Sequence, residues 1–109
     1  MDRDAQYARD MAEAIDKIFE SVSGMEYEDF LKDADVFDAC VRRLEIIGEA
    51  SKRLSADLKE RLPKIPWKEI AGFRDKAIHD YASLNAAVVW ATIQDDLPEL
   101  DKALKEFEG

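Results

Sequence analysis

DVFDACVRRLEIIGEASKRLS, residues 35–55, predicts the central helix of this protein. Its apolar and small residues recur at alternating steps of three and four, the spacing of one face of an α-helix. This stripe comprises Phe37, Cys40, Leu44, Ile47, Ser51 and Leu54, widened by Val36, Val41, Ile46 and Ala50. A stripe this wide contacts more than one neighbour. Gly48 lies in its middle at a cost of about 1 kcal/mol relative to alanine, which indicates close approach by another helix.

Two helices are predicted on the N-terminal side. Residues 4–22 carry one apolar stripe, and Ser23-Gly24 ends that helix because glycine readily takes the left-handed cap conformation. Residues 25–33 predict a helix of one or two turns, anchored by Phe30 and Leu31. The stripe of the first helix is made of Tyr7, Met11, Ile15 with Ala14, Ile18 and Val22.

On the C-terminal side, residues 56–66 predict a turn of helix closed by Pro63 and Pro66. A new helix is expected to start at Trp67. The last helix is predicted over residues 84–107, with one bend at Pro98 because its apolar stripe continues on both sides of the proline. That stripe is made of Trp90, Ile93, Leu97, Leu100, Leu104 and Phe107.

The composition agrees with an all-α fold. The chain has 109 residues, 47% of them hydrophobic and 38% charged, with only four glycines and three prolines. We expect a single domain over residues 1–109: an antiparallel bundle of four main helices plus short helical turns. No 18-residue apolar run and no secretory leader is seen, and the single cysteine, Cys40, fits the predicted core. A reduced, cytoplasmic setting is therefore expected.

The net charge of −9 is unevenly distributed. Residues 1–41 have four Lys/Arg against twelve Asp/Glu, and residues 77–109 have two against seven. Residues 42–76 have ten Lys/Arg against six Asp/Glu. A local basic surface formed by this segment is compatible with RNA binding. The alternative is that these charges are only the solvated faces of helices.

The octapeptide RDKAIHDY, residues 74–81, contains the only histidine. Arg74 can hold a phosphate through two parallel hydrogen bonds, and His79 can give and take a proton near neutral pH. On a regular helix these two residues lie about 140° apart, whereas Arg74 and Tyr81 lie within about 20°. The pair converges only if the helix ends or distorts near His79, or if a second copy of the chain completes the site.

Other chemistries find little support. One histidine and one cysteine are too few ligands for a zinc site, and the sequence has no glycine-rich phosphate loop. The carboxylates show no distinctive spacing. Neither a metal nor a cofactor is therefore expected. A structural role for the octapeptide stays open: Arg74 in an ion pair and His79 at a helix C-terminus. Asp75, four residues before His79, either orients the imidazole or pairs with a lysine.

The order Arg74-x4-His79-x-Tyr81 at the end of a predicted bundle helix resembles the signature of the HEPN superfamily. Within it, the chain is similar to the small HepT-like ribonuclease toxins encoded beside a minimal nucleotidyltransferase antitoxin. Three further stretches agree: RRLEIIGEASKRL (42–54), IPW (65–67) and DLPEL (96–100). The resemblance covers most of residues 30–105. A bare R-x4-H is a weak signal, but its combination with these stretches is specific.

The resemblance implies a homodimer that brings two motifs toward a shared cleft, and cleavage of an RNA substrate without metal. Arg74 would bind and polarise the scissile phosphate. His79 would act as general base or acid while the 2′-OH attacks, leaving a 2′,3′-cyclic phosphate. Asp75 occupies a position that is often Asn or Asp in such motifs, and Tyr81 matches the tyrosine that the antitoxin modifies with AMP.

Two other functions stay open on the sequence alone. One is a non-catalytic HEPN module that binds nucleotide or RNA and partners a nucleotidyltransferase. The other is a helical dimerisation domain in which the octapeptide is structural. His79→Ala would abolish cleavage in the enzyme, change little beyond affinity in the binding module, and lower thermal stability in the structural case.

Overall fold

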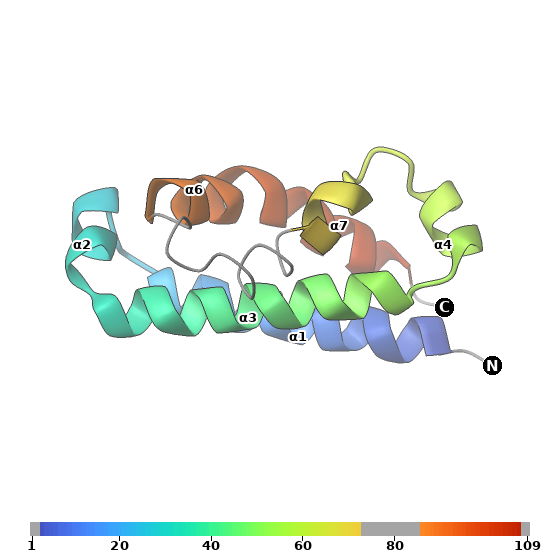
Figure 1. Ribbon diagram of the computed structural model, residues 1–109, viewed down its shortest axis with the longest axis horizontal. Helices are drawn as coiled ribbons and strands as arrows, with labels where there is room; N and C mark the ends of the chain where they lie inside the picture. The colour runs from blue at the N-terminus through green and yellow to red at the C-terminus, as the bar shows by residue number, and fades with distance from the viewer. Residues whose placement is uncertain (1–2, 73–85, 108–109) are drawn as a thin grey trace.

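The computed structural model describes residues 3–72 and 86–107, and within these ranges the ordered elements are helices (Figure 1). The predicted all-α class is confirmed. Residues 67–72 are also helical. The other elements are α1 (Arg3–Val22), α2 (Tyr27–Lys32), α3 (Ala34–Arg53), α4 (Ala56–Arg61), α6 (Ala86–Ala91), the π-helical turn η2 (Thr92–Asp96) and α7 (Leu97–Glu106).

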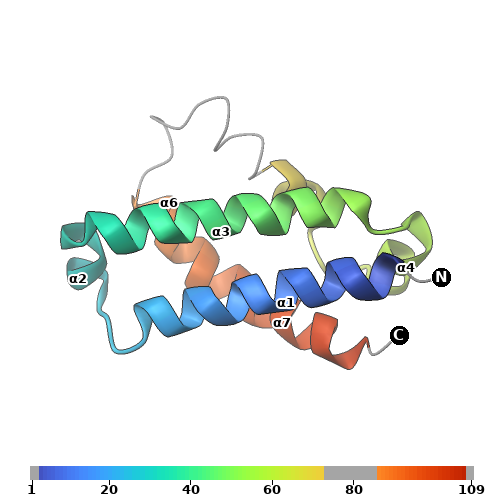
Figure 2. The same ribbon diagram turned by 90° about the horizontal axis from the view of Figure 1, so that it is seen from below.

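Helices α1 and α3 lie side by side and antiparallel, and the α6–η2–α7 segment packs across them (Figures 1 and 2). The buried side chains of these elements form one contiguous core, joined by Phe30 of α2, Leu58 of α4 and Ile65. The stripe predicted for α1 is buried as expected, apart from Tyr7, which is half-buried. None of the described helices combines the length and the apolar character needed to cross a membrane.

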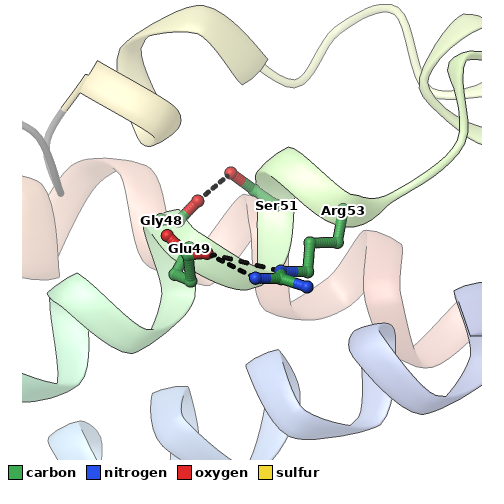
Figure 3. A network of polar contacts seen from close by, with 4 residues as sticks. All are labelled: Gly48, Glu49, Ser51 and Arg53. Carbon is green, nitrogen blue, oxygen red and sulfur yellow. Dashed lines mark hydrogen bonds and ion pairs between the residues drawn. The ribbon is translucent and has the colours of Figure 1, made fainter.

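Helix α3 confirms the predicted central stripe. Cys40 is fully buried, and Ser51 is 1% exposed with its hydroxyl donating to the Gly48 carbonyl at 2.7 Å (Figure 3). That bond satisfies a polar group in an apolar core, where an unpaired hydroxyl would cost about 1–3 kcal/mol. Gly48 is buried. Close approach of a neighbouring backbone at Gly48 stays a prediction.

Two predictions are wrong: Leu31 does not anchor its helix, and Ile46 does not extend the buried stripe of α3. Leu31 is 54% exposed because α2 has only six residues and its one buried side chain is Phe30, about 100° around the helix from Leu31. Ile46 is 37% exposed. It lies at the edge of the α3 stripe, in a surface groove that it shares with Asp10 and Ala14 of α1.

The helix ends follow local chemistry. Gly24 has φ +79°, as a left-handed cap requires, and the Met25 amide donates to the Val22 carbonyl at 2.9 Å. Asp33 caps α3 by accepting from the Val36 amide at 3.1 Å.

The C-terminal helix is continuous through the predicted bend. Its irregularity is the π-turn Thr92–Asp96, directly before Leu97 and Pro98, with the Leu97 amide donating to the Thr92 carbonyl five residues back. Proline cannot donate to the carbonyl four residues back and would clash with it, and a π-turn relieves that conflict. Ile93, Leu97, Leu100 and Leu104 are all buried, so the apolar stripe runs through the turn as predicted.

Candidate active site

The predicted site residues Arg74, Asp75, His79 and Tyr81 lie outside the described residues. The expected start of the last helix at Leu84 lies outside them too. What the structure describes is the frame on both sides of the octapeptide: residues 67–72 before it and α6 after it.

The entry to the octapeptide is fixed by IPW, residues 65–67. Ile65 is buried, the Trp67 amide donates to the Ile65 carbonyl at 2.8 Å, and the Trp67 indole Nε1 donates to the Leu62 carbonyl at 3.1 Å. The first helical bond runs from the Ile70 amide to the Pro66 carbonyl at 3.1 Å. Pro66 has no amide to donate, and none is needed at its position ahead of the first helical turn. The predicted helix start at Trp67 is confirmed.

The exit is anchored by aromatic packing. Val89 of α6 is fully buried. The Trp90 ring lies 5.1 Å from the Phe30 ring and 6.1 Å from the Tyr27 ring, centroid to centroid. Tilted aromatic pairs at these separations are each worth about 0.5–1.5 kcal/mol beyond the area they bury. Both described flanks of the octapeptide are therefore held by core contacts.

A pocket of about 240 Å³ lies beside the entry helix, between α3 and the C-terminal helix. Each of the three stretches that carry the family resemblance contributes to its wall: Leu44 and Ile47, then Pro66, then Asp96. The π-turn contributes as well, and such turns are frequent at functional sites. The described residues that line it are Leu44, Ile47, Pro66, Glu69, Ile70, Thr92, Asp96, Leu97 and Leu100.

Two carboxylates, Glu69 and Asp96, line the polar side of this pocket, which we call the acidic pocket. Asp96 is exposed, but partial desolvation of its carboxyl raises its pKa, and the nearby negative charges of Glu69, Asp95 and Glu99 raise it further. Burial and like charge both disfavour an ionised carboxylate. The acidic pocket therefore favours a ligand that offers hydrogen-bond donors.

The positive charge predicted over residues 42–76 is divided among helices. Arg53 lies 3.1 Å from Glu49 on α3 (Figure 3), an exposed pair that solvent screens. The Arg61 guanidinium lies 5.7 Å from the centre of the Phe107 ring and ties α4 to the C-terminus. Lys64, in the turn before Trp67, and Lys68, in the helical residues 67–72, are both exposed.

Cys40 is not placed for chemistry. Burial raises the pKa of its thiol to about 11, despite the opposing effect of Arg43, so the thiol is neutral at physiological pH. This agrees with the predicted role in the core. Within the described ranges, no group of His, Cys, Asp and Glu side chains is arranged to hold a metal ion.

Sequence reasoning did not identify Glu69, Thr92 or Asp96 as members of a pocket. In the sequence, DLPEL and IPW indicate only the family resemblance. Their meeting at one wall depends on how the C-terminal helix crosses α3, which the spacing of apolar residues does not specify. The signal available was Pro98, which marked the irregular turn without showing that the turn lines a cavity.

Comparison with known proteins assigns the family. Residues 11–107 match the family model described as Ribonuclease HepT-like. A relative from Caldanaerobacter subterraneus subsp. tengcongensis, named "Putative RNase TTE0752", is 46% identical over 93% of this chain and 90% of its own length. The "Probable ribonuclease HepT" of Thermococcus cleftensis is 47% identical over 86% of each chain. No solved structure matches the chain. The chain belongs to the HepT-like ribonuclease family of the HEPN superfamily.

Proposed function

We propose that this chain is a metal-independent endoribonuclease, the toxin of a two-component module whose antitoxin is a minimal nucleotidyltransferase. The proposal depends on one observation. A chain of the HepT-like ribonuclease family has its only histidine five residues after an arginine, in the order of the HEPN motif. The anchored flanks on both sides of this motif support it.

Arg74 and His79 carry the chemistry in this proposal. Arg74 binds a non-bridging oxygen of the scissile phosphate and neutralises charge that develops in the transition state. The His79 imidazole takes the proton of the neighbouring 2′-OH as that oxygen attacks phosphorus. The P–O5′ bond breaks, the leaving 5′-oxygen takes up a proton from water, and a 2′,3′-cyclic phosphate remains.

Two copies of the single domain over residues 1–109 form a homodimer in this proposal. On a regular helix Arg74 and His79 lie about 140° apart. In a cleft shared by two copies, Arg74 of one copy and His79 of the other can meet, so the two residues need not converge within one helix. Asp75 supports the site by orienting the imidazole or by raising the pKa of His79 through its negative charge. The cytoplasm, where RNA and the antitoxin meet, is the proposed compartment.

The antitoxin silences the enzyme at Tyr81. The phenolic oxygen attacks the α-phosphorus of ATP, pyrophosphate leaves, and AMP stays attached to the tyrosine. The added bulk and negative charge lie two residues from His79 and exclude RNA by sterics and repulsion.

The test is cleavage of mixed cellular RNA by the purified chain in EDTA, beside His79→Ala and Arg74→Ala. Cleavage by the parent alone, with cyclic-phosphate ends, supports the proposal. Arg9→Ala is the matched control for loss of one arginine, since Arg9 is exposed on α1 and is expected to leave cleavage unchanged. Mass spectrometry at Tyr81 first establishes that the parent carries no AMP. An unmodified, folded parent that cleaves no RNA would move the proposal to the non-catalytic module.

A further inference from the structure

The acidic pocket is separated from the proposed catalytic arginine by only a few residues of chain. Ile70 lines the pocket, and four residues further along the chain comes Arg74. Four residues of chain span at most about 14 Å, whatever conformation they take. A single strand of RNA held at Arg74 can therefore place a neighbouring nucleotide at the pocket.

The size of the pocket suits one flat group. Ligand pockets for drug-sized molecules run from about 300 to 1,000 Å³, and this one has about 240 Å³. Its apolar side is made of Leu44, Ile47, Leu97 and Leu100, which are also core residues and hold the wall rigid. A single nucleobase fits this description better than an extended ligand.

We propose, resting on the ribonuclease function above, that the acidic pocket binds an unpaired guanine base of the RNA substrate next to the cleavage site. Glu69 and Asp96 are the specificity-determining residues. The neighbouring N1–H and N2–H groups of guanine donate to one carboxylate as a bidentate pair, while Ile70 and Pro66 contact the ring.

The donor pattern selects guanine over the other bases. Adenine and cytosine present a donor beside an acceptor on the same edge, and uracil presents one donor between two acceptors. Each of them leaves a carboxylate oxygen facing an acceptor, which is repulsive. Single-stranded RNA exposes these edges, and proteins read them from splayed bases.

Charge sets which part of the nucleotide enters. Glu69, Asp95, Asp96 and Glu99 repel phosphate, so the backbone stays outside and only the base enters. Lys64 and Lys68, exposed on the adjoining segment, offer positive charge to the backbone. A purely cationic ligand, such as a lysine or arginine side chain of a partner protein, is the competing occupant, and the test below separates it.

The first arm measures cleavage of paired RNAs. A short single-stranded RNA with one guanosine beside the cut is compared with the same RNA carrying inosine, which lacks the N2 amino group. We expect the parent to cleave the guanosine RNA about 10-fold faster, because inosine keeps the N1–H bond to the carboxylate and loses only the N2–H bond, and one hydrogen bond to a charged group has an effect of about that size. In Glu69→Gln and Asp96→Asn the ratio falls toward one. Glu13→Gln, which removes an exposed carboxylate of α1, keeps the ratio of the parent.

The second arm measures binding without cleavage. Guanosine, inosine, adenosine and agmatine (a guanidinium on a four-carbon chain) are titrated into the full chain, and amide shifts are followed by NMR. Guanosine is expected to shift Ile70, Thr92 and Leu97 more than inosine or adenosine does, and the shifts are lost in Asp96→Asn. Shifts with agmatine and none with guanosine would overturn the proposal in favour of a cation pocket.

The two arms distinguish failure of the guanine-pocket proposal from failure of the proposed ribonuclease function. Guanosine binding at the pocket without any RNA cleavage keeps the pocket and rejects the enzyme. Cleavage with equal rates for guanosine and inosine RNAs, in parent and variants alike, rejects the pocket and keeps the enzyme.

Discussion

The Asp4 carboxylate accepts two hydrogen bonds from Ser55, 51 residues later in the chain. The Ser55 amide donates to Oδ1 at 2.8 Å, and the Ser55 hydroxyl donates to Oδ2 at 2.6 Å. The same hydroxyl oxygen accepts from the Leu58 amide at 3.1 Å and caps α4. One serine thus joins the start of α1 to the start of α4, at the end of the molecule where both lie (Figure 1).

Removing the Asp4–Ser55 contact is expected to lower stability. Ser55→Ala loses both the cap and the tie to α1, and caps are typically worth about 1 kcal/mol. Asp4→Asn keeps the size of the side chain and weakens only the charge-assisted bonds, so its effect is smaller. Urea unfolding of both single variants and the double variant measures the coupling. Strict additivity of the two losses would show that the contact contributes nothing.

Cys40 predicts a fall in stability at high pH. The pKa of its thiol rises from 9.0 to about 11 on folding, so above pH 9 the unfolded chain releases a proton that the folded chain keeps. The unfolded state then binds fewer protons, and the free energy of unfolding declines between about pH 9 and 11. Cys40→Ala removes this part of the decline, which unfolding at pH 8, 9 and 10 measures. Iodoacetamide labelling of the native parent is expected to be slow, and rapid labelling would contradict the burial.

Asp96→Asn is expected to stabilise the protein at pH 7. The pKa of Asp96 is raised from 3.8 by partial desolvation and by its acidic neighbours, so its ionised form is less favourable in the folded state than in the unfolded state. This destabilisation is present at neutral pH and disappears as the pH falls below 3.8, where the carboxyl is neutral in both states. Thermal unfolding at pH 7 should therefore show a gain that shrinks toward acid pH. A gain in stability of equal size at pH 7 and at acid pH would exclude a charge effect.

Pro98 is expected to be tolerated because the π-turn precedes it. Pro98→Ala should change the free energy of unfolding by less than about 1 kcal/mol, since the chain already lacks regular α-helical bonds there. Lys102→Pro is the matched control: Lys102 is exposed within α7, and a proline in a regular helix costs about 3 kcal/mol. A gain near 3 kcal/mol in Pro98→Ala would show that the proline strains the helix.

Apolar spacing was enough to predict most of the fold. The stripe of α3, the buried face of α1 and the stripe from Ile93 to Leu104 follow from side chains that return to one face every three or four residues. The end of α1 at Gly24 and the helix start at Trp67 follow from local backbone preferences. Leu31 and Ile46 were assigned wrongly because spacing says which residues share a face, and not how far a neighbouring helix covers it.

The sequence by itself determined the helices, their apolar faces and, through Arg74, His79 and the three resembling stretches, the family. These depend on local preferences and on the order of side chains along one helix. Only the tertiary structure decided that Glu69, Thr92 and Asp96 meet with Leu44 and Ile47 in one acidic pocket. A pocket depends on the crossing of helices distant in the chain, and that crossing is set by how whole faces pack together.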